Sequence, residues 1–385
     1  MFCRGFVKYH TGNRLHFLRV SKGYIFIIIL PNLFADTHPP QDTIYYMSPT
    51  VAITGSSGFI GSHLIKILTS KGVPTLGLDL LEPQDDAAPS SFIKLDIREE
   101  SKVKAALKDI NIVYHLASAV PLASKMGLES VNVEGSKIVA SASQAASVFI
   151  NVSSSAVYGR PVDLPVLPST PTRPVEQYGR SKLLAERTIK EALAPNTRLV
   201  NIRPRTVLGP QRGGIFSVLF DLLDQNLPLP VLGSSTIIQF LHVNDLVEAL
   251  LVAAESGTCP EVVNIGAPSP RQLRLELSDL VSHANSSSKV MILPKRLSMS
   301  AAALASKLRL SPLAPWHTST YGVSNFVDLS PAESAGIVPK YSNYATLLDA
   351  YSNRPTSSDR SPHTSVLSAP LLMKTLRVLG GTSRG

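Results

Sequence analysis

The sequence predicts an α/β fold in which a doubly wound parallel sheet is joined to a smaller C-terminal lobe. Between residues 51 and 202, short apolar runs rich in β-branched residues alternate with stretches of helical spacing. A glycine-rich turn separates the first run from the first helical stretch, and an acidic residue ends the second run. The chain has 385 residues, 44% of them hydrophobic and 17% charged, which suits a large core and excludes disorder of the whole chain.

The elements follow one another in regular order. The first run, Val51-Ala52-Ile53-Thr54, is apolar throughout, as is typical of a strand buried on both faces of a parallel sheet. Strands are expected at residues 51–54, 75–79, 92–97, 112–117, 148–152 and 198–202. Helices are expected at residues 62–70, 100–108, 133–146 and 178–193. This alternation predicts a parallel sheet with helices on both of its faces.

The turn after the first strand has the spacing of a dinucleotide-binding loop. Gly55 permits the tight turn, Gly58 lets the backbone approach a pyrophosphate, and Gly61 allows the helix to pack against the strand. The helix N-terminus then presents N–H groups to the phosphates. The loop residues expected to contact the cofactor are Gly55, Ser57, Gly58, Phe59, Ile60 and Gly61. A purely structural glycine turn is the alternative, but the flanking strand and helix favour a Rossmann-type nucleotide site.

Asp79, at the end of the second strand, indicates which dinucleotide binds. Its carboxylate can accept hydrogen bonds from both hydroxyls of the adenosine ribose. A 2′-phosphate would meet the negative charge of the same group, so NAD is favoured over NADP.

Two further segments form a candidate catalytic set. Ser153, Ser154 and Ser155 follow the strand at 148–152, at the sheet edge where ligands bind in open α/β sheets. Tyr178 and Lys182 are four residues apart and therefore share one helix face. An ammonium beside a phenol lowers the pKa of the phenol and makes it a usable general acid or base. A Tyr-x-x-x-Lys pair is common on amphipathic helices and serines at a strand end often only form turns, but their order after the glycine loop favours function.

Together these motifs resemble the extended short-chain dehydrogenase/reductases of the NAD-dependent epimerase/dehydratase group, over residues 51–351. The matching segments are Thr54-Gly55-x-x-Gly58-x-x-Gly61, Asp79, Asp96-Ile97, His115-Leu116-Ala117-Ser118, Asn132, Ser153-Ser154-x-x-x-Tyr158-Gly159, Tyr178-x-x-x-Lys182, Arg203-Pro204, Gly209-Pro210, His242-Val243-Asn244-Asp245-Leu246, Asn264-Ile265-Gly266 and Asp328-Leu329-Ser330 with Gly336 and Pro339. The ordered set is specific for the family and much less specific for the substrate.

The resemblance implies roles for individual residues. Asp96 and Ile97 would contact the adenine, and Lys182 would also bind the nicotinamide ribose. Ser154, four residues before the Tyr-Gly pair, would be the catalytic serine, while His115 would be structural. The cofactor residues expected at the end of the fourth strand and on the helix at 178–193 are Leu116, Ala117, Ser118, Tyr178 and Lys182.

Two differences from related enzymes narrow the choice of reaction and substrate. Related 4,6-dehydratases and decarboxylating enzymes place an acid just after the catalytic hydroxyl residue, whereas this chain has Ser155 and Ala156 there. Many sugar-nucleotide enzymes hold the substrate with an asparagine where this chain has Thr206, our candidate for substrate binding. The first hypothesis is an epimerase that acts on a nucleotide sugar through a transient keto intermediate. The second is an NAD-dependent reductase or dehydrogenase of a non-sugar alcohol or ketone, and the third is a non-catalytic NAD-binding regulator.

The flanks differ from the body in charge and composition. Of the formal net charge of +9, residues 1–46 carry +3 and residues 352–385 carry +4. The body therefore carries too little excess positive charge to favour binding of nucleic acid. The apolar run at 24–30 is too short to span a bilayer. Only two cysteines are present, which excludes a disulfide framework, and neither has the neighbours of a metal site. We therefore expect a cytoplasmic enzyme, a homodimer with a small-molecule substrate, with no metal and no stable membrane insertion.

The predicted domain organisation has four parts. Residues 1–46 are an extension, either disordered or preceding a natural start at Met47, with a targeting segment as the alternative, and residues 47–205 bind NAD. Residues 206–351 are mainly the substrate-binding lobe, with 237–266 returning to the sheet, and residues 352–385 are a disordered tail rich in Ser and Pro.

Overall fold

The computed structural model describes residues 6–11, 14–21, 24–30, 50–120, 127–211, 215–294 and 322–354. The chain divides into two compact units, residues 1–47 and 48–385. The first unit contains an antiparallel sheet with β2 in the centre, made of β1 (Phe6–Thr11), β2 (Arg14–Ser21) and β3 (Tyr24–Leu30). The sequence allowed for a disordered extension here and predicted no strands. The third strand, β3, is rich in isoleucine, which has a high strand propensity. A natural start at Met47 stays a prediction.

The second unit is built on a seven-stranded parallel sheet with the strand order β13-β9-β8-β7-β4-β5-β6. Its strands are β4 (Val51–Thr54), β5 (Thr75–Asp79), β6 (Ser91–Lys94), β7 (Ile112–His115), β8 (Val148–Val152), β9 (Arg198–Pro204) and β13 (Val262–Ile265). The chain order reverses between β4 and β7, and such a switch point opens a crevice at the carboxyl ends of the strands. The predicted α/β fold with a parallel sheet is confirmed.

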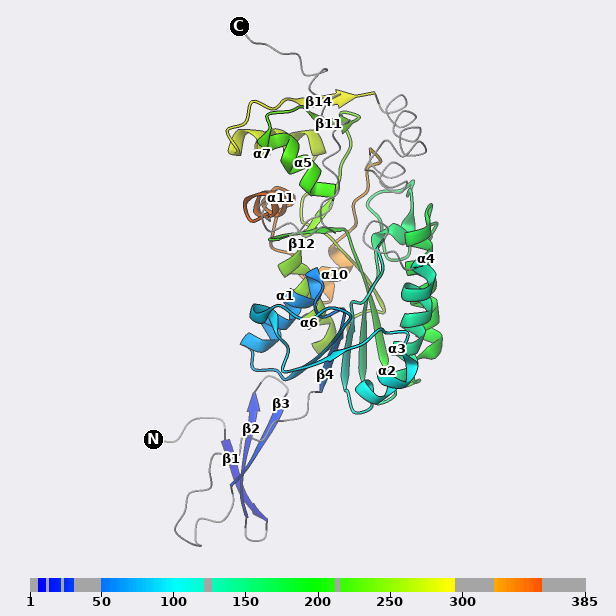
Figure 1. Cartoon of the computed structure of the whole chain (residues 1–385), viewed down its shortest axis with the longest axis vertical. Coiled ribbons are helices and arrows are strands. Elements are labelled where there is room, and N and C mark those ends of the chain that lie inside the picture. Colours follow the sequence, from blue (N-terminus) through cyan, green and yellow to red (C-terminus); the bar gives the residue numbers. More distant parts are fainter. Residues whose placement is uncertain are drawn as a thin grey trace, which may run out of the picture. The chain divides into compact units, whose positions relative to one another are not determined.

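Helices cover both faces of this sheet (Figure 1). On one face lie α1 (Phe59–Ser70) and α6 (Val243–Glu255), and on the other α2 (Glu100–Leu107), α3 (Ser136–Ala142) and α4 (Gln177–Ala192). Each layer has its own buried core. Leu64, Ile65 and Leu250 belong to the first, and Val103, Val139 and Ile189 to the second. Apolar strands buried from both sides explain why the sequence shows continuous hydrophobic runs.

A third core holds the C-terminal lobe together. Leu229, Phe240 and Leu277 are among its buried members. The elements of the lobe and its connections are β10 (Thr206–Leu208), α5 (Ile215–Asp224), β11 (Leu229–Leu232), β12 (Phe240–His242), α7 (Leu273–His283), β14 (Val290–Leu293), α10 (Ser330–Ser334) and α11 (Asn343–Ser352). Of the segment 237–266, β13 pairs with β9 in the main sheet, whereas β12 pairs with β10. From residue 355 on, the predicted tail lies outside the described residues.

The helix predicted at 133–146 differs most from the structure. It begins as a π-helix, η2 (Ser130–Gly135), continues as α3 and ends at Ala142. A single turn of π-helix frequently marks a functional site, because it turns one side chain out of the regular helical register. Here η2 contains Asn132, whose contacts are described below. Two short 3₁₀-helices, η1 (Asp85–Ala87) and η3 (Ser155–Tyr158), complete the described elements of this unit.

Within the described ranges, no helix combines the length and the apolar character that a membrane span requires.

Candidate active site

The glycine turn leaves no room for side chains at two of its positions. Gly55 has a φ of +71°, and a Cβ added to it would lie 2.7 Å from the backbone nitrogen of Ala117. A Cβ added to Gly61 would lie 2.2 Å from the carbonyl oxygen of Gly55. Because these neighbours are backbone atoms, any larger residue would push the loop away from the sheet. In the described part of the chain, no side chain caps the N-terminus of α1 and its first turn has no acidic residue, which suits a pyrophosphate there.

Asp79 lies directly beside this turn. One of its carboxylate oxygens accepts a hydrogen bond of 3.0 Å from the backbone N–H of Ser57, and the other accepts one of 3.0 Å from the N–H of Leu81. The Ser57 hydroxyl also donates to the carbonyl of Leu81 at 2.6 Å. These contacts fix the carboxylate at the edge of the glycine turn with lone pairs remaining on both oxygens, as recognition of a ribose diol requires.

The two residues predicted to contact the adenine lie just after β6. Asp96 accepts hydrogen bonds from the Arg98 guanidinium at 3.0 and 2.6 Å, and these bonds lower its pKa. Ile97 is buried, and a Cβ added to Gly135 would lie 2.6 Å from its Cδ1. The side chain of Ile97 therefore belongs to the core, which leaves its backbone for a cofactor.

Asn132 connects the loop after β7 with the helix that carries the candidate catalytic pair, Tyr178 and Lys182. Its amide oxygen accepts hydrogen bonds from the Ser118 hydroxyl at 3.1 Å and from the backbone of Ala119 at 2.7 Å. Its amide nitrogen donates to the Ala119 carbonyl at 3.1 Å and to the Ser181 hydroxyl at 3.0 Å. All four hydrogen-bonding capacities are thus used, and the half-buried segment Leu116, Ala117 and Ser118 is held facing α4. The sequence marked Asn132 as a family position but gave it no role.

The serine and the tyrosine of the candidate catalytic set come from two segments in direct contact. Ser154 precedes η3, and its hydroxyl accepts a hydrogen bond of 3.1 Å from the N–H of Ala156. A Cβ added to Gly179 would lie 2.6 Å from the carbonyl oxygen of Ala156, so the first turn of α4 packs against η3. Glu176 caps that turn by accepting hydrogen bonds from the N–H groups of Tyr178 at 2.7 Å and Gly179 at 2.8 Å. This cap fixes the start of the helix, and with it Tyr178, beside the serine segment.

Lys182 is buried one turn further along α4. Its side chain and backbone together are 4% exposed, and burial lowers the pKa of the ammonium to about 8. Glu186, one turn further again, opposes this shift. The ammonium is therefore still charged near pH 7, where it can favour the phenolate form of a neighbouring tyrosine.

One turn after Lys182 along α4, Glu186 belongs to a buried polar network that sequence reasoning missed. Glu186 accepts a hydrogen bond from Ser153 and is paired with the Arg203 guanidinium at 2.9 and 2.6 Å. Arg203 also donates to the Tyr158 hydroxyl at 2.7 Å, which in turn donates to Asn264 at 2.8 Å. Burial raises the pKa of Tyr158, which keeps this hydroxyl protonated. The spacing of Glu186, four residues after Lys182 on the same helix face, was the signal that could have indicated a link.

His115 is close to the site but has a structural environment. Its ring nitrogens lie 2.8 Å from the Thr54 hydroxyl and 2.8 Å from the Ser136 hydroxyl. Burial, together with the charge of Lys182, lowers its pKa to about 3. A neutral ring with both nitrogens engaged fits the structural role that we expected and not that of a general base.

Thr206 and Arg205 follow the end of β9. Thr206, the predicted substrate residue, is half-buried at the start of β10. Arg205 donates a hydrogen bond of 2.8 Å from Nη1 to the hydroxyl of Ser155. Burial lowers the pKa of its guanidinium to about 10.

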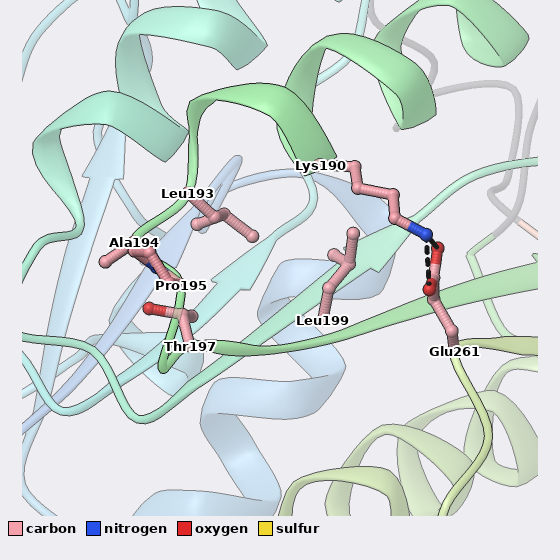
Figure 2. A pocket seen from close by; sticks show the side chains of 7 residues that line it. All are labelled: Lys190, Leu193, Ala194, Pro195, Thr197, Leu199 and Glu261. Carbon is pink, nitrogen blue, oxygen red and sulfur yellow. Dashed lines mark hydrogen bonds and ion pairs between the residues drawn. The ribbon is translucent and has the colours of Figure 1, made fainter.

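A surface hollow at the other end of α4 is a separate feature. Figure 2 shows Lys190 paired with Glu261 at one side of it, and the apolar side chains of Leu193 and Leu199 beside it. Its volume is about 230 Å³. Twelve residues of helix separate Tyr178 from Lys190, a rise of about 18 Å, so the hollow takes no part in the candidate site.

Comparisons with known proteins give a consistent result. A model of the NAD dependent epimerase/dehydratase family matches residues 51–266. The uncharacterized protein y4nG of Sinorhizobium fredii is 38% identical over 308 residues, 78% of this chain and 78% of that protein. The UDP-glucose 4-epimerase of Azospirillum brasilense is 27% identical over 237 residues, 54% of this chain and 68% of that enzyme.

A solved structure shares the fold. The UDP-glucuronic acid 4-epimerase of Bacillus cereus, in complex with UDP-glucuronic acid and NAD, matches with a TM-score of 0.63 and 23% identity. The match covers 79% of this chain and 98% of that chain. At this identity the likeness shows the fold alone.

Proposed function

Because the chain belongs to the NAD-dependent epimerase/dehydratase family of extended short-chain dehydrogenase/reductases, we propose that it is an epimerase acting on a nucleotide sugar through a transient keto intermediate. The observation that carries the proposal is the catalytic helix, which brings Tyr178 and the buried Lys182 to the segment of Ser154. The UDP-glucose 4-epimerase among its relatives supports the substrate class.

NAD is the cofactor of this family, and the residues of the chain fit it. At Gly55 and Gly61 the turn has no room for any side chain, so its backbone packs closely against the loop after β7 and the start of α1, and Asp79 is fixed beside it by the N–H of Ser57, which supports binding of a dinucleotide here. The residues that would hold NAD are Gly55, Ser57, Gly58, Phe59, Ile60, Gly61, Asp79, Asp96, Ile97, Leu116, Ala117, Ser118, Tyr178 and Lys182. When bound, NAD supplies a reversible two-electron acceptor.

The side chains of the site provide the proton chemistry. Tyr178 takes the proton of the reacting hydroxyl and returns it at the end of the cycle. The Lys182 ammonium lowers the pKa of this phenol, and the Ser154 hydroxyl donates to the same substrate oxygen and stabilises its charge. Neither Ser155 nor Ala156 can act as the acid that elimination of water requires. These residues therefore support a reaction that restores the hydroxyl group of the substrate, and they do not support loss of water from it.

One experiment tests the reaction class. The protein is incubated with UDP-sugars and with simple ketones and alcohols, while absorbance at 340 nm follows NADH and NMR identifies products. An epimerase converts a UDP-sugar into its epimer with NAD retained and with no net absorbance change. Stoichiometric NADH formation or consumption with a non-sugar substrate would instead establish the second hypothesis, a reductase or dehydrogenase.

Asp79 is expected to decide the choice of cofactor. NAD should bind about 10²-fold more tightly than NADP, because a carboxylate and a phosphate in contact repel each other by several kcal/mol. Asp79→Ala should shrink this ratio to below about tenfold. Isothermal titration with both dinucleotides measures it, and Asp109→Ala, which removes an exposed acid after α2, is the matched control. Tighter binding of NADP by the unaltered protein would contradict the role of Asp79.

We propose further that the enzyme is a cytoplasmic homodimer. A chain with two cysteines needs no oxidising compartment for disulfides, which supports the location. Light scattering of the purified protein, and fractionation of cells that express it, measure the two properties.

A further inference from the structure

Arg205 is a desolvated cation that has no anionic partner among the residues that the structure describes. Of its guanidinium nitrogens, Nη1 donates to the Ser155 hydroxyl at 2.8 Å, whereas the buried Nε has no acceptor. Among the described residues, no carboxylate lies within ion-pair distance of it. By contrast, Arg203, two residues earlier, is paired with Glu186 through two nitrogens. A buried donor with no acceptor is rare in native proteins and is often completed by a ligand.

The position of Arg205 follows from its contacts at the carboxyl ends of β8 and β9. Arg203 on β9 and Ser153 after β8 both reach Glu186, so they lie on the face of the sheet that α4 covers. Arg205 lies at a bend directly after β9, where its N–H bonds to the carbonyl of Ile265, and its guanidinium reaches Ser155, the first residue of η3 after β8.

Contacts with η3 place Arg205 beside the start of α4. Ser155, which holds the Arg205 guanidinium, is the first residue of η3, and the next residue, Ala156, packs against Gly179 in the first turn of α4. The residue before Ser155 is Ser154, and the residue before Gly179 is Tyr178. Arg205 is thus a neighbour of the reacting centre and not of a remote part of the substrate.

We propose that Arg205 binds a carboxylate on the sugar ring of the substrate, so that the substrate is a nucleoside diphosphate uronic acid. This inference rests on the proposed function and makes it more specific. Nε and Nη2 form one edge of the guanidinium, and such an edge binds a carboxylate through two parallel hydrogen bonds. Nη1 remains on Ser155, which holds the group in place. The diphosphate of a nucleotide sugar extends from the sugar ring toward the nucleoside. It is therefore a less suitable partner than a ring carboxylate for a cation beside the reacting centre.

The test compares two substrates that differ only at C6, UDP-glucuronic acid and UDP-glucose. We expect the unaltered enzyme to have a kcat/KM about 10–100-fold higher for UDP-glucuronic acid, the usual value of a charged hydrogen-bonded pair. Arg205→Met should lower kcat/KM for the acid by the same factor and change that for UDP-glucose less than about threefold. Arg205→Lys should fall between them, because it keeps the charge and loses the two-point contact. Arg187→Met, on the exposed face of α4, removes an equal charge as control.

The outcomes are distinguishable. Equal losses with both UDP-sugars in Arg205→Met would assign Arg205 to the diphosphate or to the fold and overturn the inference, while the proposed epimerase stands. A preference of the unaltered enzyme for UDP-glucose would overturn it without any variant, even if Arg205→Met did not fold. If neither UDP-sugar is converted, this inference fails for UDP-uronic acids, whereas the proposed function fails only if no sugar nucleotide of the wider panel is epimerised. Melting temperature and NAD binding of Arg205→Met should equal those of the unaltered protein, since no charged partner is left behind.

Discussion

Tyr178→Phe is expected to lower turnover by about 10²–10⁴-fold, the usual contribution of a general acid or base. The phenylalanine keeps the ring and its packing, and Lys182 remains to bind the nicotinamide ribose. The affinity for NAD should therefore change little. Turnover on the UDP-sugar that is found to react, together with titration of NAD, measures both quantities.

The other two members of the catalytic set give the comparison that identifies the mechanism. Lys182→Ala should impair both turnover and NAD affinity, because in the proposed mechanism the lysine lowers the pKa of the tyrosine and also binds the cofactor. Ser154→Ala should have an intermediate effect on turnover, since it removes one hydrogen bond to the reacting oxygen. Near-normal turnover of Tyr178→Phe would refute the proposed mechanism, whatever the fold.

The pH dependence of turnover provides an independent check on the same set. The pKa of Lys182 is about 8, so its ammonium is present below that pH and is lost above it. The support that the charge gives to the phenolate should therefore decline as the pH rises through 8. In Lys182→Ala this alkaline limb should be absent from the residual activity.

The linear motifs were sufficient to predict the fold and to select the residues of the candidate site. The glycine spacing at 55–61, the acid at 79 and the pair at 178 and 182 are local patterns, and each depends on residues within one turn or one helix face. The structure places the cofactor motifs at one edge of the sheet, where the topological switch lies. These elements could be predicted because strand, turn and helix each impose a period on the sequence.

What the sequence did not indicate depends on contacts between distant segments. Asn132 joins residues 119 and 181 through one amide, and Glu186 joins residues 153 and 203 through one carboxylate. These contacts have no spacing signature, because the partners lie on other strands and helices. Only the position of Glu186 four residues after Lys182 was a signal in the sequence, and it indicates the helix face and not the contacts with residues 153 and 203. The π-helix at Ser130–Gly135 was missed for the same reason, since its apolar spacing resembles that of an ordinary helix.

Glu186→Gln is expected to lower the free energy of unfolding by about 3–5 kcal/mol, because it leaves the Arg203 guanidinium buried without a counter-charge. Both side chains of this pair are 7% exposed, so solvent screens them little. The amide keeps the size of the carboxylate, and the loss therefore reports charge and not a cavity. Urea unfolding followed by circular dichroism measures it, with Glu191→Gln, an exposed glutamate on the same helix, as the matched control.

Glu186→Gln should also change the pKa of Lys182. Glu186 raises the pKa of Lys182 against the effect of burial, so its removal should bring that pKa below about 8. The ammonium is then lost at a lower pH, and the alkaline limb of the turnover profile should move toward neutrality. An unfolding free energy and a pH profile that both match those of Glu191→Gln would show that the buried pair neither holds the fold nor tunes the lysine. A loss of stability with an unmoved profile would restrict Glu186 to the fold, and the link from the buried network to Tyr178 would then be wrong.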